Sequence, residues 1–353
     1  MISDLFRLFH IFPTPYYDYY NKFNIDPAVQ HPSRMEHELK PVIQKRRDER
    51  LNIICDKTLL SAAIDGVSKA VTLRSTIPVL EGILLKAEGF QLTLTGYDLE
   101  MGIVTTIEAN VKEPGEIVLN AKLLSSMISR MPSGQITIQS ADNGKTTIQS
   151  GVAQFEIQSM SATDFPELPN TGAEETLTIP TGVLRDMIDR TLYAVSQDEK
   201  KPAHTGELFE IEPDKLTVVA LDGYRLAIVE RPIQAVKDIR IIVPSKTMTE
   251  VAHLLANDDE ELVHICANRR YVVFMTAGYT IMSRLIEGEF LNYHNVIPAG
   301  SRTRVTLDTK DFIETIERAS LIITERLKNP LRISFTEGKV VVRCQTNLGR
   351  VVD

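Results

Sequence analysis

Two stretches of the chain, TLLSAAIDGVSKAV at residues 58–71 and GVLRDMIDRTLYAV at residues 182–195, align without a gap. In both, apolar residues recur at intervals of three and four, the spacing of a helix with one buried face. These apolar residues are Leu59, Leu60, Ala63, Ile64, Val67 and Val71 in the first stretch, and Val183, Leu184, Met187, Ile188, Leu192 and Val195 in the second. A helix that returns with the same apolar face indicates a repeated structural unit.

The same offset of 124 positions continues well beyond these helices. The matched pairs include Pro78 and Pro202, Gly82 and Gly206, Asp98 and Asp222, and Lys122 and Lys246. A third copy begins near Arg304: KDFIETIERASLII, from Lys310, matches the first helix, and LRISFTEGKVVVRCQ matches ILLKAEGFQLTLTGY after a short deletion. The third copy ends at Asp353, so the sequence predicts two full repeats and an incomplete third.

Within a repeat, the pattern predicts a strand, a helix and three further strands, followed by a second such set. In the first repeat we expect helices at 57–70 and 121–131. Strands are expected at 79–87, 91–95, 101–109, 116–119, 135–139, 145–149 and 153–159. Glycines such as Gly89, Gly134 and Gly151 supply the turns. Short antiparallel strands with two helices on one face predict an α+β domain.

Composition excludes several classes of protein. The 353-residue chain is 43% hydrophobic and 24% charged, typical of globular domains. Cys55, Cys266 and Cys344 form no C-x-x-C pair, which argues against a disulfide framework or a structural zinc site. No P-loop, G-x-S-x-G or H-E-x-x-H motif indicates an enzyme. The net charge of −8 disfavours a nucleic-acid partner only if the basic residues are not clustered.

Several motifs in order resemble one family. They are RSTIPVLEGILL (74–85), LTGYDLEM (94–101), SATDFPEL (161–168), HTGELFE (204–210), VALDGYRLAI (219–228), IIVPSK (241–246) and LIEGEFLNYHNVIP (285–298). From Leu51 to Asp353 the chain resembles the bacterial β sliding clamp, the beta subunit of DNA polymerase III. The resemblance implies three domains, here 51–170, 171–300 and an incomplete 301–353, of the DNA clamp fold.

In that family two subunits close head-to-tail into a ring around duplex DNA and tether the polymerase. The resemblance therefore implies a non-catalytic, cytoplasmic processivity factor, without cofactor or metal and without a membrane partner. The implied partners are double-stranded DNA, a second copy of the chain and short peptides of the replicative polymerase catalytic subunit, the clamp loader and repair proteins. A ring needs equivalent units related by rotation, which agrees with the repeat.

Three sets of site residues follow from the resemblance. The expected DNA contacts are Arg74, Lys122, Gln197, Lys201 and Lys246. The expected peptide pocket consists of His204, Leu221, Gly223, Tyr224, Arg225, Leu226, Leu291 and Val296. His204 stands where the family commonly has an apolar residue, and Leu291 where some members have proline, so the peptides that fit are expected to differ. Leu321 and Ile322, on the first helix of the third unit, are the expected dimer interface; ordinary core packing is the alternative.

The two ends of the chain depart from the family pattern. Residues 1–50 have no counterpart, which leaves two interpretations. Either the start is misassigned and the true start codon is at Leu51, or the segment is a real addition whose aromatic run FPTPYYDYYNKF (12–23) binds a partner. Because the third unit is incomplete, we expect the first two domains to fold but the ring to close poorly. A peptide-binding scaffold that never encircles DNA, and an enzyme, remain as alternative functions.

Overall fold

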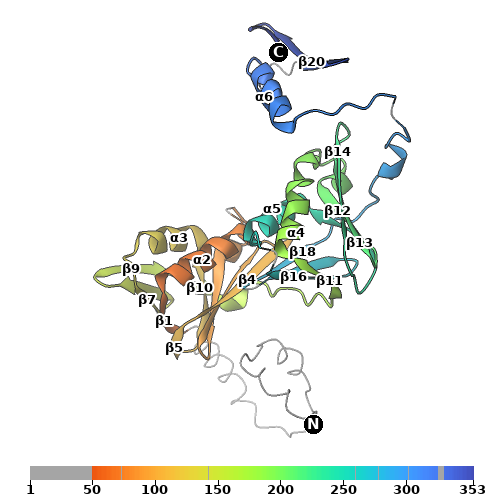
Figure 1. Cartoon of the computed structure of the whole chain (residues 1–353). Helices are drawn as coiled ribbons and strands as arrows, with labels where there is room; N and C mark the ends of the chain where they lie inside the picture. The colour runs from red at the N-terminus through yellow and green to blue at the C-terminus, as the bar shows by residue number, and fades with distance from the viewer. Residues whose placement is uncertain are drawn as a thin grey trace, which may run out of the picture. The chain divides into compact units, whose positions relative to one another are not determined.

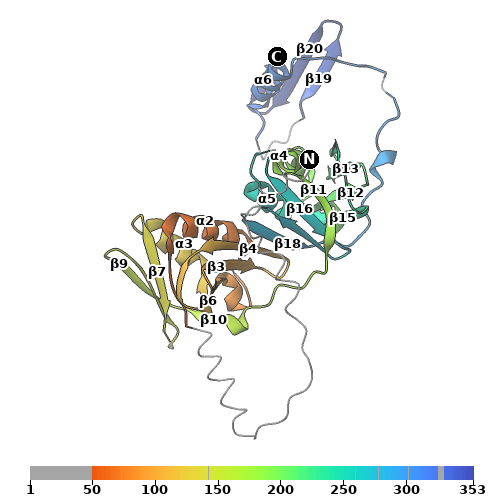
Figure 2. The same ribbon diagram turned by 60° about the horizontal axis from the view of Figure 1, so that its bottom comes forward.

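The structure is a computed structural model that describes residues 50–72, 74–141, 143–258, 260–276, 278–300, 302–324 and 330–353. Both interpretations of residues 1–50 therefore concern residues that, apart from Arg50, lie outside the described part of the chain. The chain divides into two units, Met1–Phe290 and Leu291–Asp353, each described by itself below. Figure 1 and Figure 2 show the elements of both units.

The first repeat contains two helices and ten strands. Its helices are α2 (Lys57–Val67), followed by the 3₁₀ turn η1 (Ser68–Ala70), and α3 (Ala121–Arg130). Its strands are β1 (Asn52–Asp56), β2 (Gly82–Glu88), β3 (Gln91–Tyr97), β4 (Met101–Glu108), β5 (Asn110–Glu113), β6 (Gly115–Asn120), β7 (Gln135–Ser140), β8 (Lys145–Ser150), β9 (Ala153–Gln158) and β10 (Met160–Ser161). The expected strands are all present, each within a few residues of its predicted bounds, whereas the sequence pattern missed β5 and β10.

The second repeat has the same order of helices and strands, except that its described residues form no counterpart of β5 or β10. Its helices are α4 (Thr181–Asp189) and α5 (Ser245–Leu254). Its strands are β11 (Glu174–Pro180), β12 (Gly206–Ile211), β13 (Lys215–Leu221), β14 (Leu226–Pro232), β15 (Ile239–Pro244), β16 (Leu262–Ala267), β17 (Tyr271–Met275) and β18 (Tyr279–Arg284). The repeat seen in the sequence is therefore a repeat of structure.

The helices begin where local side chains or neighbouring backbone satisfy their first N–H groups. Asp56 accepts hydrogen bonds from the N–H groups of Thr58 and Leu59 at the start of α2, and Asn120 does so for Leu123 in α3. Pro180 and Pro244 precede α4 and α5 and provide no such side chain. At α4, the Thr181 N–H instead donates to the carbonyl of Glu261.

One antiparallel sheet joins the two repeats. Its nine strands run β10-β6-β2-β3-β4-β18-β17-β16-β11, so that β4 of the first repeat pairs with β18 of the second. Two further sheets, β5-β1-β7-β8-β9 and β14-β13-β12-β15, complete the repeats. The helix pairs α2–α3 and α4–α5 lie next to one another along one side of the shared sheet (Figures 1 and 2).

Close contacts reinforce the β4–β18 pairing. The Tyr279 hydroxyl donates a hydrogen bond to the Ala62 carbonyl of α2, at 3.1 Å. The ring crosses α2 at Gly66, where a Cβ atom would lie 2.5 Å from the Tyr279 Cε1 atom. The Thr105 hydroxyl donates to the Gly278 carbonyl at 2.6 Å. A single apolar core, from Leu51 to Leu285, continues through both repeats, so the two repeats form one packed body.

The second unit, Leu291–Asp353, contains α6 (Thr309–Ser320) and the sheet β19 (Arg332–Thr336), β20 (Lys339–Thr346) and β21 (Gly349–Val352). Leu321 and Ile322 were expected on its helix, but α6 ends at Ser320. The chain tightens into a turn there, because the Ile323 N–H donates to the Ser320 carbonyl three residues back. Leu321 is 81% exposed and is not packed in the core of this unit, whereas Ile322 is half-buried.

Candidate functional site

The five residues expected to contact DNA all have exposed side chains in the structure. Arg74 lies in a bend after η1, and Gln197 and Lys201 lie in the segment between η4 (Leu192–Ala194) and η5 (Pro202–His204). Lys122 and Lys246 are each the second residue of a helix, α3 and α5. The two lysines thus occupy equivalent places in the two repeats.

Lys246 differs from Lys122 because it has an acidic partner. Its ammonium group forms a salt bridge with the Asp98 carboxylate, which is nearly buried at the end of β3. The other oxygen of Asp98 accepts hydrogen bonds from the N–H groups of Glu100 and Met101, at 3.0 and 2.7 Å. Asp98 therefore shapes the β3–β4 turn of the first repeat and holds a lysine of the second.

The two helix pairs differ in charge. The α2, η1 and α3 segments carry four basic residues, Lys57, Lys69, Lys122 and Arg130, against one acidic residue, Asp65. The α4 and α5 segments, with the cap residue Arg190, carry three basic residues, Arg185, Arg190 and Lys246, against Asp186, Asp189 and Glu250. The first pair therefore carries the larger excess of positive charge.

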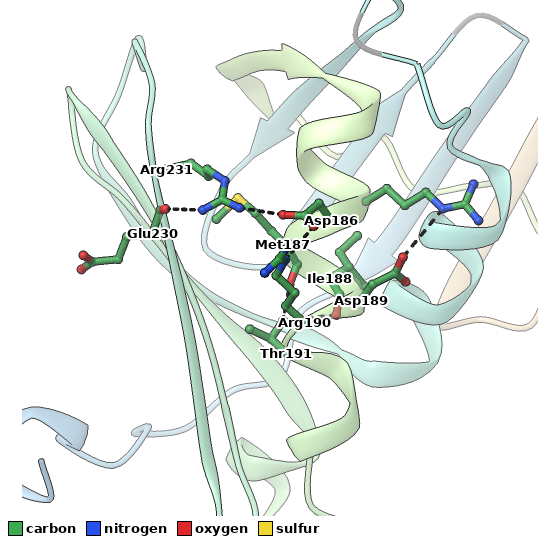
Figure 3. Close-up of polar contacts among 9 residues, drawn as sticks. Asp186, Met187, Ile188, Asp189, Arg190, Thr191, Glu230 and Arg231 are labelled. Atoms are coloured by element: carbon green, nitrogen blue, oxygen red, sulfur yellow. Dashed lines mark hydrogen bonds and ion pairs between the residues drawn. The ribbon is translucent and has the colours of Figure 1, made fainter. Parts of the chain in front are cut away.

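Ion pairs account for much of the charge on α4 (Figure 3). Asp186 lies between two arginines: its Oδ1 atom is 2.6 Å from Arg190 Nε, and its Oδ2 atom is 2.6 Å from Arg231 Nη2 on β14. Hydrogen bonds from Arg190 and then from Arg231 hold the pKa of the Asp186 carboxyl below its usual value. This cluster ties α4 to β14 and leaves little unbalanced charge at that helix.

The LDGYRL motif forms the β13–β14 turn. Leu221 is buried at the end of β13, and Leu226 begins β14 half-buried. Between them Gly223 has a φ of 90°, a conformation that favours glycine. The Asp222 Oδ1 atom accepts hydrogen bonds from the N–H groups of Tyr224 and Arg225, at 2.9 and 3.1 Å, as Asp98 does in the first repeat. These bonds hold the pKa of Asp222 below its usual value.

Tyr224 and Arg225 project from this turn. The Tyr224 side chain is fully exposed. The Arg225 guanidinium lies 5.5 Å from the centroid of the Tyr193 ring, and its Nε atom is 2.9 Å from Asp222 Oδ2. Tyr193 was absent from the expected site. The sequence indicates only that Tyr193 is an aromatic residue outside the apolar stripe of its helix, so that it is expected on the surface.

His204, at the end of η5, packs edge-on against Phe290, with ring centroids 5.5 Å apart. Partial burial, and next the positive charge of Lys201, lower the pKa of the His204 imidazole below its usual value. The lowered pKa favours the uncharged imidazole, which packs against the Phe290 ring. Leu291 and Val296, the other expected pocket residues, belong to the second unit, where both are exposed.

Neither a metal site nor a membrane span emerges from the described residues. No group of three or more His, Cys, Asp or Glu side chains among them could hold a metal ion. No described helix is long and apolar enough to cross a membrane.

Family models identify the two repeats. Residues 51–169 match the DNA polymerase III beta subunit, N-terminal domain, and residues 178–292 match the central domain of the same subunit. Among curated relatives, the beta sliding clamp of Halalkalibacterium halodurans is 32% identical over 317 residues, covering 86% of this chain and 83% of the relative. That of Bacillus subtilis is 30% identical over 309 residues, covering 84% and 82%.

Solved structures agree with these matches. The sliding clamp of Bacillus subtilis superposes with a TM-score of 0.83 at 29% identity, covering 86% of this chain and 83% of the other. A Pseudomonas aeruginosa clamp bound to griselimycin gives a TM-score of 0.80 at 28% identity, with the same coverages. The expected family and the α+β clamp fold are confirmed, and the chain belongs to the DNA polymerase III beta subunit, or beta sliding clamp, family.

Proposed function

We propose that this chain acts as a sliding clamp through two surfaces of its paired repeats, one for duplex DNA and one for peptides. Sliding clamps are non-catalytic processivity factors, which agrees with the expectation that the chain is not an enzyme. The observation that carries the proposal is the shared nine-stranded sheet, which holds two helix pairs along one side. Consecutive helix pairs along one side of a sheet can line a channel for DNA.

The proposed DNA contacts are Arg74, Lys122, Gln197, Lys201 and Lys246. Sliding requires attraction to phosphates without readout of bases, and exposed lysines at helix starts and in loops provide it. The excess of basic residues on α2 and α3 supports a larger contribution from the first repeat. Because Lys246 forms an ion pair with Asp98, we expect it to contribute less to DNA binding than the equivalent residue Lys122.

In the paired repeats, the proposed peptide site consists of His204 and the β13–β14 turn. The sequence resemblance adds Leu291 and Val296 to the residues that we propose contact peptides. Buried Leu221 beside half-buried Leu226 offers an apolar base, and exposed Tyr224 and Arg225 flank it. Short peptides of the polymerase, the clamp loader and repair proteins are the proposed ligands. We also propose the domain bounds 51–170, 171–300 and 301–353, a head-to-tail dimer that uses Leu321 and Ile322, and a cytoplasmic location.

Retention on DNA of different topology tests the clamp function. The chain is loaded onto nicked circular DNA with a clamp loader, and half of the sample is then linearised. Retention on circles with loss from linear DNA, measured by gel filtration, would support the clamp function, and it would contradict the expectation from the sequence that the ring closes poorly. Binding of peptides without any retention on circles would favour a scaffold that never encircles DNA. Sedimentation of the same sample tests the proposed dimer.

A further inference from the structure

The salt bridge between Asp98 and Lys246 joins the first repeat to one of the proposed DNA contacts. The Asp98 side chain is 6% exposed, whereas that of Lys246 is 56% exposed. A phosphate group can therefore reach the lysine but hardly the carboxylate. Among the residues that the structure describes, Lys246 is the one basic partner of Asp98. If Lys246 turns to DNA, the Asp98 carboxylate is left nearly buried without a cation, which is unfavourable.

The second repeat shows why Asp98 takes its partner from another repeat. The equivalent residue Asp222 shapes its turn in the same way, and its Oδ2 atom accepts a hydrogen bond from Arg225 of that turn, at 2.9 Å. The position of Arg225 is occupied in the first repeat by Met101, which is apolar and buried. The β3–β4 turn therefore has no cation of its own at this position, and the Oδ2 atom of Asp98 pairs with Lys246 instead.

Asp98 also lies next to the hydrogen bonds that connect the two repeats. Its Oδ1 atom accepts hydrogen bonds from the N–H groups of Glu100 and Met101. The Glu100 carbonyl in turn accepts a hydrogen bond from the Arg284 N–H at the end of β18, at 2.8 Å. Met101 is paired with Ser283 of the same strand. The side chain that pairs with Lys246 therefore also orders the residues at which β4 meets β18.

We propose that Asp98 regulates the DNA site by competing with DNA phosphates for Lys246, so that binding of duplex DNA at Lys246 weakens the connection between the repeats at the β3–β4 turn. This inference rests on the proposed DNA-binding function. Coupling between two equilibria is reciprocal, so removal of the Asp98 charge should strengthen DNA binding at Lys246. Lys122, the equivalent residue of α3, has no acidic residue in its own helical turn and is expected to bind DNA without this competition.

Other charged side chains near the pair are arranged differently. Glu100, in the same turn as Asp98, and Arg284, on β18, are both exposed and opposite in charge. Glu250, one turn beyond Lys246 on α5, has its Oε2 atom 3.3 Å from the Nδ1 atom of His253. Asp98 is distinguished from these acidic residues because it is nearly buried and bonded to Lys246 itself.

The test measures binding of a short fluorescent DNA duplex to the full chain by anisotropy, over a series of salt concentrations. Asp98→Asn removes the charge and keeps a side-chain oxygen for the two backbone hydrogen bonds of the turn. We expect this variant to bind about 3- to 10-fold more tightly at low salt, with a salt dependence steeper by up to about one phosphate contact. Glu108→Gln, which removes an exposed carboxylate at the other end of β4, is the matched control and should change both quantities much less.

The same substitution in a Lys246→Ala background tests whether the two groups compete. Asp98→Asn should bring little gain there, because the lysine that it would release is absent. A gain of equal size in both backgrounds would show that Asp98 only repels DNA, and the competition would be refuted.

Hydrogen exchange measured by mass spectrometry tests the effect on the connection between the repeats. Saturating duplex DNA should speed exchange of the amides of Glu100, Met101 and Arg284 in the unaltered chain. In Asp98→Asn the same DNA should leave these amides unchanged, because no salt bridge is given up. If DNA slows their exchange in the unaltered chain, or does not alter it, DNA binding does not weaken this connection and the inference is wrong.

The outcomes separate the inference from the function on which it rests. If the unaltered chain binds no duplex even at low salt, the proposed DNA site fails, and the inference fails with it. If the unaltered chain binds and Asp98→Asn binds equally or more weakly, the inference alone is overturned. A thermal melt of each variant identifies unfolding. Should Asp98→Asn unfold, Asp98→Ser takes its place, because a serine hydroxyl also accepts backbone hydrogen bonds in turns.

Discussion

Glu207 is a charged residue type buried in an apolar core. It lies on β12 with no exposed surface, and its Oε1 atom is 2.5 Å from the Thr191 hydroxyl oxygen at the end of α4. That hydroxyl has one proton, and the Met187 carbonyl lies within hydrogen-bond distance of it, at 2.8 Å. When the Thr191 hydroxyl donates its proton to the Met187 carbonyl, it has none left for Glu207. A protonated Glu207 carboxyl then supplies the proton of the hydrogen bond between Glu207 and Thr191. Burial raises the pKa of Glu207 to about 8, which the Thr191 bond opposes.

This residue makes stability depend on pH. Because the pKa of Glu207 is higher in the folded chain than its ordinary value of 4.5, folding is favoured most at low pH. The stabilisation decreases above pH 4.5 and is lost once the pH passes about 8. The expected loss in the free energy of unfolding is on the order of a few kcal/mol.

Urea unfolding of the full chain between pH 5 and 9 measures this loss. The Glu207→Gln variant, which stays neutral, should show a flatter pH profile and greater stability at pH 8. Glu212→Gln, an exposed residue, controls for the general effect of removing a carboxylate. A profile for Glu207→Gln that follows the unaltered chain would show that Glu207 is ionised in the fold.

The two repeats have the same backbone conformation at a position where their residues differ. Leu99 has a φ of 76°, the one positive φ among the described non-glycine residues, and Gly223 at the equivalent position has a φ of 90°. We expect Gly223→Ala to lower the free energy of unfolding by about 1 kcal/mol, and Leu99→Gly to cost much less than a glycine normally does. Thermal unfolding checks both. Gly300→Ala, at a glycine without this conformation, should have little effect; an equal loss there would contradict the prediction.

At the scale of elements, the sequence predicted helices and strands well because their periodic apolar faces repeat at a fixed offset. The pattern that predicted the helix at 57–70 cannot say where α-helix gives way to the 3₁₀ turn at Ser68. The sequence pattern also did not predict contacts between residues that lie far apart in the chain. The Asp98–Lys246 salt bridge and the Tyr193–Arg225 contact join residues far apart in sequence, and no local spacing encodes them.

The equivalent lysines on α3 and α5 allow a matched comparison. Lys122→Ala should weaken DNA binding and reduce its salt dependence by about one phosphate contact, with stability unchanged. Lys246→Ala should affect DNA less and should lower stability, because Asp98 is left nearly buried without its partner. Salt titrations of DNA binding and urea unfolding measure the two effects. The same response from both lysines would rule out a special role for the Asp98 pair.

The close packing between the two repeats depends on a residue of α2 that α4 does not share. Gly66 makes room for Tyr279, and its counterpart in the second repeat is Arg190, which is bonded to Asp186. Equivalent surfaces of α2 and α4 thus differ in chemistry, one apolar and closely packed, the other an ion-pair cluster. Repetition of the backbone therefore does not make the surfaces of the two repeats interchangeable.

For the whole molecule, the two units differ in how much core they bury. Among described residues of Leu291–Asp353, the buried apolar side chains are Tyr293, Ala319, Val342 and Cys344, whereas the core of the paired repeats holds several dozen. We expect amides of α6 and β20 to exchange with deuterium much faster than those of β2 and β3. Mass spectrometry of the full chain measures this, and equal protection in both units would contradict it.

The nine-stranded sheet has a consequence for how the chain could be divided. Between Phe165 and Glu174 a single, partly exposed connection links the repeats, while five β4–β18 residue pairs, from Thr105–Tyr279 to Met101–Ser283, hold them together independently. A backbone cut near Asn170 would leave those pairs intact. Two separately expressed polypeptides, ending and starting at that point, should therefore recognise one another and assemble, as the halves of a split reporter do.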